Sequence, residues 1–437
     1  MKNINKDSLN LMMSIIYCVS LFFSFTNLVP LSICYVLYVF FIPFIFFKIR
    51  NYHAIQKVLV VIYLYFVLSC LFYDSSALLN YNFYRRDGNF FVTYLPLLLL
   101  PYSEIKIDVK KIVSYFLIIE SVVNGICYIN YLSGHQNLIF SKYSILNPEL
   151  YHFLFVAHNA AGGYIGCVLS IAMAFFICEH GNKKIKYLIC VIINFITLIA
   201  TDSRGTIFAI IFAIVFLGLS RVGITIKKFN IYMDEIVFVI MLLGSIALAI
   251  YIYICWGNNS FNTHVQDILQ NELFGKFGFA QRRTGEMYIR LLKLWPTAIA
   301  FFLASPIIGC GFGSYNDSLA LHEYVKGIFS WNYPEQYIYS DGHAHQSFLN
   351  ILAETGVVGL VLILILLWCI RKSIFLIKDK AVSVGLYLAL VVNVMSSFTE
   401  HRIFTPSQMI PFVLILSITL ASRENLISNI EEENDNG

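Results

Sequence analysis

Long apolar runs separated by short polar segments make up most of this chain. A helix needs roughly 20 apolar residues to cross a bilayer, and runs near that length recur along the sequence. They fall at about 11–28, 29–47, 58–73, 89–101, 112–132, 151–179, 187–201, 206–220, 235–256, 348–370, 381–399 and 406–421. The pattern predicts an all-α polytopic membrane protein with about 12 transmembrane helices, of which run 89–101 is short enough to be re-entrant.

One polar stretch is much longer than the others and divides the chain. We expect residues 1–256 to form transmembrane helices 1–9, and residues 348–421 to form helices 10–12. Between them, residues 257–347 form a large loop with an amphipathic segment, "GEMYIRLLKLWPTAIAFFLASP", which is expected to lie on the membrane surface or to cap the bundle. Residues 422–437 are expected to form a disordered cytoplasmic tail, because "SNIEEENDNG" is acidic and nearly free of apolar residues.

The distribution of basic residues predicts the orientation. With a cytoplasmic N-terminus, the inner segments hold most of the 30 Lys and Arg residues. More than half of the remainder lie in the long loop, and long loops translocate regardless of charge. Both ends of the chain are therefore predicted to be cytoplasmic, with the long loop on the outer side of the membrane.

Composition agrees with this class and excludes several functions. The chain is 58% hydrophobic and 13% charged, whereas soluble domains average about 25% charged residues. A net charge of +4 gives no indication of nucleic acid. The glycine-rich turn "GCGFGSY" follows no predicted strand, and no Walker motif or G-x-S-x-G occurs, so no nucleotide cofactor is expected. Neither is a zinc site, because the cysteines lie almost entirely in apolar runs and no Cys-x-x-Cys occurs.

Several arginines are candidates for binding an anion. The segment "TDSRGT" places Arg204 at the outer end of the seventh predicted helix, where an arginine normally faces a cavity or a partner. In the loop, Arg283 and Arg290 lie two helical turns apart and share a face. A guanidinium offers a planar fork of donors that fits phosphate oxygens. The alternatives are an interfacial arginine for Arg204 and a solvated basic face for the loop.

Two histidines at the end of the loop, His343 and His345, are candidates for proton transfer. They would share a face only in an extended segment. A metal site with Asp341 or Glu354 and a purely structural pair are the alternatives, but no third histidine has suitable spacing. We favour a general base, because a histidine of ordinary pKa, about 6.5, can accept a proton at neutral pH.

Two further outer segments carry charge. "YNFYRRDGNFF" contains Arg86, and "FTEHRIFTP" contains Glu400 and Arg402. Each segment could serve only to anchor the chain at the membrane interface. However, arginines at the ends of the predicted helices gather on the outer face, against the positive-inside bias. This gathering indicates that an anionic molecule binds there.

These residues together resemble a known family. His345-Gln346, nine residues, Gly356, two residues and Gly359 fit the H-[NSQ]-x9-G-x-x-[GTY] pattern of bacterial O-antigen ligases, and related O-antigen polymerases carry similar segments. Weaker matches are "HNAAGGY", "SRG", "FTEHRIFTP" and a Trp…Pro-x-x-Gly-x-Gly pattern that begins at Trp295. The resemblance covers roughly residues 150–420. The family usually has an arginine about four residues before the tryptophan, where this chain has Leu291.

The resemblance implies a metal-independent glycosyltransferase with a GT-C-like fold. The family transfers a glycan from undecaprenyl diphosphate to an acceptor sugar hydroxyl on the periplasmic face, with no cofactor. His345 would then be the catalytic base. The diphosphate would be bound by Arg204 and by Arg290 or Arg283, since the shifted tryptophan spacing leaves both loop arginines open. Residues that could support the site are Arg86, His343, Glu400 and Arg402.

The resemblance leaves the acceptor open. The end of another lipid-linked repeat unit would make the protein a polymerase, and the lipid A core of lipopolysaccharide would make it a ligase. We favour a polymerase, because the basic loop around Arg86 could hold a second lipid diphosphate. A polymerase could also have a chain-length regulator as a partner. A transporter without chemistry is the alternative of another class, but the sequence lacks the two similar halves that transporters often show.

Overall fold

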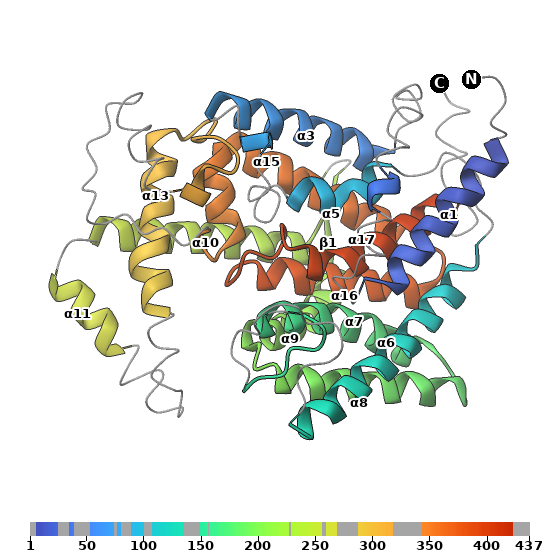
Figure 1. Ribbon diagram of the computed structural model, residues 1–437. Coiled ribbons are helices and arrows are strands. Elements are labelled where there is room, and N and C mark those ends of the chain that lie inside the picture. The colour runs from blue at the N-terminus through green and yellow to red at the C-terminus, as the bar shows by residue number, and fades with distance from the viewer. Residues whose placement is uncertain are drawn as a thin grey trace.

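The fold was examined in a computed structural model of the 437-residue chain (Figure 1). The structure describes residues 6–24, 35–38, 53–73, 77–79, 89–99, 107–134, 149–155, 157–226, 229–255, 259–268, 287–317 and 343–422. All structural statements below concern these residues.

Helices dominate the described residues. The α-helices outside the loop region are α1 (Lys6–Phe22), α3 (Ala54–Tyr73), α5 (Asn89–Leu98), α6 (Val109–Leu132), α7 (His158–Cys178), α8 (Lys183–Ala200), α9 (Arg204–Leu219), α10 (Met233–Cys255), α15 (Ser347–Phe375), α16 (Lys380–Ser396) and α17 (Pro406–Ala421). A short 3-10 helix, η2 (Ala77–Leu79), follows α3. Every predicted apolar run except 29–47 overlaps one of these helices, and of that run the structure describes only residues 35–38.

Six described helices are long and apolar enough to cross a membrane, and five shorter apolar helices accompany them. The protein is therefore a multi-pass membrane protein. The total of about 12 spans and the division of the chain at 257 and 348 stay predictions.

Helix α7 lies at the centre of the bundle and packs against α8, α16 and α17. Its glycines explain how the neighbours come so close. A Cβ atom at Gly163 would lie 2.4 Å from the Cγ of Gln408 on α17, and one at Gly166 would lie 2.2 Å from the Cγ2 of Thr206 on α9. Small residues let helix backbones approach in a membrane, where packing rather than hydrophobic burial drives association. The segment "HNAAGGY" therefore forms a close-packed helix start.

A β-hairpin departs from the predicted all-α fold. Strands β1 (Gly223–Ile226) and β2 (Phe229–Tyr232) pair antiparallel between α9 and α10, with Gly223 opposite Tyr232. Its Ile, Thr, Phe and Tyr residues favour strands. The sequence prediction treated this stretch as a simple loop because it is too short to show a clear alternating pattern.

The described parts of the long loop contain four helical segments. They are α11 (Asn259–Asp267), a π-helical turn η4 (Arg290–Leu294), α13 (Trp295–Ala304) and a 3-10 turn η5 (Ser314–Asp317). Figure 1 shows α13 running across the direction shared by α3, α10 and α16. By length and composition alone, Met287–Ala304 could span a membrane. Because α13 runs across the direction of those helices, we favour the prediction that this segment lies on the membrane surface or caps the bundle.

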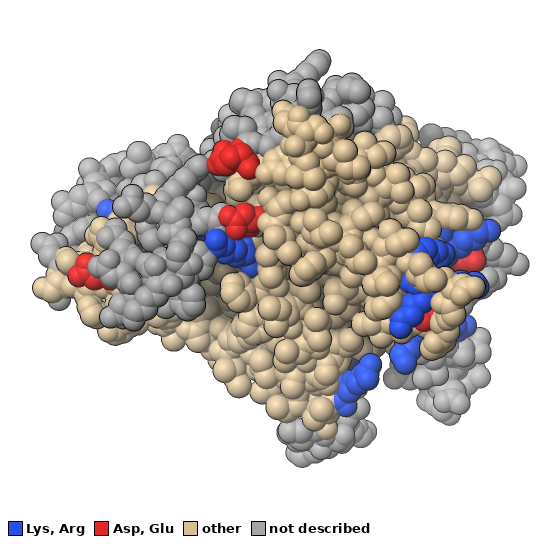
Figure 2. Space-filling model, turned by 90° about the horizontal axis from the view of Figure 1, so that it is seen from below, with Lys and Arg blue, Asp and Glu red and all other residues tan. Residues whose placement is uncertain are grey.

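Basic residues gather at one end of the bundle. Figure 2 shows most of the visible Lys and Arg side chains at the end away from α11 and α13. Helices α6 and α8 begin with lysines, including Lys110, Lys111, Lys183 and Lys184. This is the end that the sequence assigned to the cytoplasm.

Candidate active site

Two glycine segments interlock at the start of α15. Gly356 has φ 62° and interrupts the helix, so that its first part runs beside α13 and the rest turns into the bundle (Figure 1). The turn after α13 fills the interruption: the N–H of Val357 donates to the carbonyl of Pro306 at 2.8 Å, and the N–H of Gly311 donates to the carbonyl of Glu354 at 2.8 Å. A Cβ atom at Gly309 would lie only 2.3 Å from the Glu354 backbone. The turn after α13, at residues 306–311, and the bend of α15 at Gly356 therefore pack together, and we call this contact the glycine joint.

This joint is tied to the bundle by polar side chains. The hydroxyl of Tyr65 on α3 lies 3.0 Å from the carbonyl oxygen of Ile308 and 2.8 Å from that of Thr355. The buried carboxylate of Glu354 accepts the N–H of Tyr315 at 3.0 Å. Glu354 thus holds the glycine turn, a structural role rather than the metal-ligand role considered from the sequence. The joint sets where the first turn of α15 lies.

The residues just before α15 have a tightly determined backbone. The side chain of Gln346 caps the helix by accepting the N–H of Leu349 at 2.5 Å. The N–H of Ala344 donates to Oδ1 of Asn350 at 3.0 Å, and the N–H of His345 donates to Nδ1 of His343 at 3.2 Å. His345 has φ 49°, a left-handed conformation that is uncommon outside glycine. The two histidines are neighbours because of this turn, not because the segment is extended.

The segment between α16 and α17 lies directly against this turn. Ser347 joins the two: its N–H donates to the carbonyl of Ser397 at 2.9 Å, and its Oγ accepts the N–H of Arg402 at 2.9 Å. The same hydroxyl donates to the carbonyl of Glu400 at 3.3 Å. Ser347 therefore places Glu400 beside His345, although 55 residues separate the two in the sequence.

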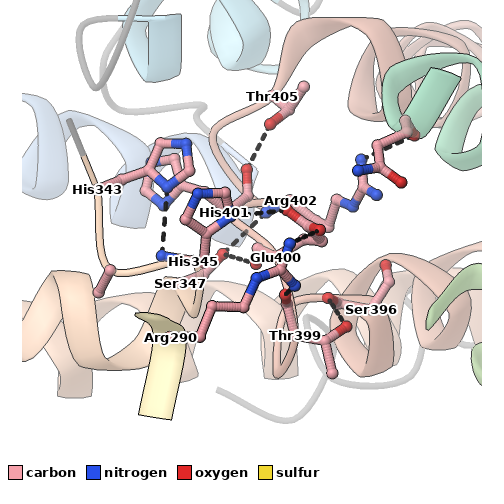
Figure 3. Close-up of polar contacts among 12 residues, drawn as sticks. Arg290, His343, His345, Ser347, Ser396, Thr399, Glu400, His401, Arg402 and Thr405 are labelled. Carbon is pink, nitrogen blue, oxygen red and sulfur yellow. Dashed lines mark hydrogen bonds and ion pairs between the residues drawn. The ribbon is translucent and has the colours of Figure 1, made fainter. Parts of the chain in front are cut away.

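Glu400 is the centre of the candidate site (Figure 3). Its Oε2 lies 3.1 Å from Nδ1 of His345, and its Oε1 accepts Nη2 of Arg290 at 2.8 Å. Nη1 of Arg290 also donates to the carbonyl of Thr399 at 2.7 Å. Arg290 begins the π-helical turn η4, a distortion often found at functional sites. One carboxylate thus links a histidine and an arginine that come from different elements.

The charge state of Glu400 follows from these partners. Burial by itself would raise the pKa of this carboxyl. The hydrogen bond with His345 and the positive charges of Arg290 and Arg402 outweigh burial and hold its pKa well below its usual range. Glu400 is therefore ionised at neutral pH and can only accept hydrogen bonds.

An ionised Glu400 determines which nitrogen of His345 carries the hydrogen. Because the carboxylate has no hydrogen to donate, Nδ1 of His345 must donate to it. In the neutral imidazole the lone pair then lies on Nε2, which can accept a proton from a substrate. The same arrangement orients the histidine in Ser-His-Asp enzymes.

Three rings stack beside His345. The rings of His343 and His401 are parallel to within 11°, with centroids 5.0 Å apart, and the ring of His401 lies 4.7 Å from that of Phe404. His343 also contacts His345 edge to face, at 4.2 Å between centroids. The stack borders the histidine on the side opposite Glu400 (Figure 3).

The remaining predicted arginines occupy different places. Arg402 is buried, and its Nη1 donates to the carbonyl of Asn159 on α7 at 3.1 Å. Arg204 begins α9 and pairs with Asp202 at 3.1 Å, with 40% of its side chain exposed. A Cβ atom at Gly205 would lie 2.8 Å from Oγ1 of Thr399, so the start of α9 packs against the segment that carries Glu400.

The structure brings His345, His343, Arg290, Glu400 and Arg402 together. Arg204 lies next to this group through Gly205. Arg283 and Arg86 lie outside the described residues. Among the described residues, no group of three or more His, Cys, Asp or Glu is arranged to hold a metal ion.

Sequence reasoning missed two contributors. Ser347 directly follows His345-Gln346, but a serine at a helix start normally indicates only a cap. His401 adjoins Glu400 in "FTEHR", and this adjacency was the one available signal. The stacking of His401 on His343 joins residues 58 positions apart and is a property of the tertiary structure alone.

Residues 189–364 match a family described as O-Antigen ligase. This match, which covers less than half of the chain, supports the resemblance to O-antigen ligases and polymerases. The matched segment includes Arg204, Arg290, His343 and His345, whereas Glu400 lies beyond it. A comparison with curated proteins finds no match. The match is consistent with a glycosyltransferase-like enzyme of surface-polysaccharide biosynthesis.

Proposed function

We propose that this protein transfers a glycan from undecaprenyl diphosphate to a sugar hydroxyl of the acceptor. The observation that carries the proposal is the position of Glu400 between Nδ1 of His345 and the guanidinium of Arg290. It leaves the histidine with a basic Nε2 and places a cation nearby. Transfer from a lipid diphosphate needs both a base for the acceptor and positive charge for the leaving group.

The transfer is a substitution at the anomeric carbon. The acceptor hydroxyl loses its proton to Nε2 of His345 as its oxygen forms the new glycosidic bond. The bond from the anomeric carbon to the diphosphate oxygen breaks, and both electrons leave with the diphosphate. Glu400 stabilises the imidazolium that results, because its carboxylate accepts the hydrogen on Nδ1.

Arginines bind the diphosphate in this proposal. The described contacts of Arg290 use one N–H on each of its terminal nitrogens, and a guanidinium carries five N–H groups. Arg204 begins a helix, where backbone N–H groups and the helix dipole also favour an anion. Arg290 and Arg204 are the primary diphosphate ligands in this proposal. Arg283 is kept as the alternative loop ligand, and Arg86 as a ligand for a second lipid diphosphate.

An apolar groove near the site suits the lipid part of the donor. It lies between α9, α10, α15 and α16, and its volume is about 260 Å³. Phe238 lines the groove and contacts Phe348 and Phe398, which directly follow Ser347 and precede Thr399. A hydrocarbon chain in this groove would bring its diphosphate to the arginines at the bundle end.

We propose the bacterial inner membrane as the location, with the active site periplasmic and both chain ends cytoplasmic. The gathering of lysines at the end of the bundle away from α13 supports this orientation. A lipid-linked repeat unit is the favoured acceptor, which would make the enzyme a polymerase that a chain-length regulator could assist. Attachment to the lipid A core is the alternative.

Purified protein in lipid nanodiscs, given a lipid-linked repeat unit, tests the proposal. Release of undecaprenyl diphosphate together with a lengthened glycan supports a polymerase. Release only when the lipid A core is added supports a ligase. Movement of the intact lipid across a bilayer, without release of diphosphate from either mixture, would overturn the enzyme proposal in favour of a transporter.

A further inference from the structure

His343 is the hydrogen-bond acceptor for the backbone of His345. Its Nδ1 accepts the N–H of His345 at 3.2 Å, and its ring contacts the His345 ring edge to face. The acceptor must be an unprotonated nitrogen, so the hydrogen of neutral His343 lies on Nε2. His343 therefore acts on the position of His345 through its backbone as well as its ring.

This backbone contact matters because His345 has a left-handed conformation. A non-glycine residue with φ 49° costs on the order of 1–3 kcal/mol and persists only where the surroundings hold it. The neighbouring N–H of Ala344 is held by Asn350, and the cap of α15 is held by Gln346. At His345 itself, the nitrogen of His343 is the acceptor.

His401 in turn holds the ring of His343. It lies between His343 and Phe404 in a parallel stack, and its exposed fraction is 7%. It belongs to the same short segment as Glu400, the carboxylate that orients His345 from the other side. Glu400 and His401 are adjacent residues. One contacts His345 directly, and the other acts on it through the ring of His343.

We propose that His343 and His401 are positioning residues for His345. As a stacked pair they fix its left-handed backbone and so aim Nε2 at the acceptor hydroxyl. The proposal rests on the proposed function of His345 as the base.

His343 must stay neutral to accept the hydrogen bond from His345. Protonation of His343 puts a hydrogen on Nδ1 and removes the acceptor for His345. Burial lowers the pKa of His343 well below its ordinary value, and His401 and His345 lower it further. Arg290 acts in the same direction, while Glu400 opposes it. Arg402, which also faces Glu400, adds to the cationic surroundings.

Four substitutions distinguish the contribution of the stacked rings from that of the hydrogen-bond acceptor on His343. His343→Phe keeps a ring in the stack but removes the acceptor, and we expect kcat to fall about 100-fold, the scale of a small misplacement of a catalytic group. His343→Asn offers an amide oxygen near the position of Nδ1 and is expected to retain more activity than His343→Phe. His401→Ala removes the stack and should lower kcat by about threefold to tenfold, and His401→Phe should lower it less.

The matched control is His180→Phe, since His180 is an exposed histidine that follows α7 at the far end of the bundle. Thermal unfolding of each variant in the same detergent shows whether it is folded. Donor KM should change little, because positioning of the base affects the reacting complex rather than donor binding.

The pH profile gives a readout that a structural role would not change. As pH falls, protonation of His345 alone gives log(kcat/KM) a slope of one. Protonation of His343 at lower pH adds a second proton, so the slope of wild type should steepen towards two. His343→Asn, whose acceptor does not titrate in this range, should keep a slope of one throughout.

Either of two results overturns the proposal: folded His343→Phe with a kcat equal to that of His180→Phe, or the same steepening in His343→Asn as in wild type. Failure of the proposed function would look different, since wild type itself would then release no lipid diphosphate. Carbethoxylation of His345, followed by mass spectrometry, checks the geometry without turnover. Its rate should rise in His343→Phe and stay the same in His180→Phe.

Discussion

The molecule contains two arginine–carboxylate clusters that differ in how the carboxylate is shared. In the first, Arg371 on α15 pairs with Asp234 on α10 through two bonds, of 2.8 and 2.9 Å. Tyr387 on α16 donates to the same carboxylate at 2.6 Å, and Arg371 also lies over the ring of Tyr232. Every charged group in this cluster faces a fixed partner inside the protein.

The second cluster shares its carboxylate between unlike partners. Each oxygen of Glu400 meets a different residue, Arg290 or His345. Its residues lie at the ends of helices and in a strained turn, whereas Asp234, Arg371 and Tyr387 lie within helices.

The difference distinguishes a structural cluster from the proposed active site. A buried ion pair whose groups are all satisfied ties helices together and offers nothing to a substrate. A carboxylate that orients a histidine and an arginine prepares both for a third molecule. The following predictions test this distinction, from the largest expected effect on turnover to the smallest.

His345→Ala should abolish glycan transfer, with a loss up to about 10⁴-fold, because the acceptor hydroxyl loses its base. The measurement is release of undecaprenyl diphosphate by purified protein. His180→Phe is the control, and the amount of folded variant in the membrane should equal that of wild type. Near-normal transfer would remove His345 from the mechanism.

Glu400→Gln should lower kcat on the order of 10³-fold, although the side chain keeps its shape. A glutamine amide can donate to Nδ1 of His345, which moves the hydrogen to Nε2 and removes the base. Turnover of Glu400→Gln is compared with that of Asp267→Asn, which changes an exposed acid on α11. If Glu400→Gln works as well as this control, Glu400 does not set the tautomer of His345.

Arg204→Lys should lower kcat/KM by about 100-fold, because lysine keeps the charge but loses the planar fork. The matched control is Arg221→Lys, an exposed arginine that follows α9 at its other end. Turnover should be measured over a range of donor concentrations. Full activity in Arg204→Lys would mean that binding of the diphosphate by a guanidinium fork is wrong.

Asp234→Ala should act mainly on stability, with a much smaller effect on turnover per folded molecule than the substitutions above. Removal of the carboxylate takes two hydrogen bonds from buried Arg371 and leaves Glu235 as its acidic partner, so the loss of unfolding free energy should lie below the about 3–5 kcal/mol of a fully unpaired buried charge. Unfolding in mixed micelles measures the loss, and Asp234→Ala combined with Arg371→Leu should recover part of it. A large fall in kcat with normal stability would contradict the structural role.

Much of the fold and part of the site could be predicted from the sequence. The apolar runs located nearly all the described helices, since membrane spans require long apolar segments. The pattern of His345, Gly356 and Gly359 indicated the family that residues 189–364 match, and His345 as the base stays a prediction. The hairpin β1–β2 was not predicted, because two four-residue strands leave too little periodicity to recognise.

The role of Glu400 could not be predicted from its sequence neighbours. "FTEHRIFTP" is equally compatible with interfacial anchoring, and only the contacts to His345 and Arg290 distinguish the two. The same holds for His401, whose stack with His343 depends on how two loop ends meet.

The sequence by itself determined that this is a multi-pass membrane protein, and it identified the residues that could carry out transfer from a lipid diphosphate. Apolar length and motif spacing are local properties, so they can be read from the chain. Tertiary structure decided which of those residues act together. Glu400 meets His345 and Arg290 only because the glycine joint bends α15 and Ser347 ties it to the segment before α17. Such contacts between distant segments depend on the packing of the whole bundle.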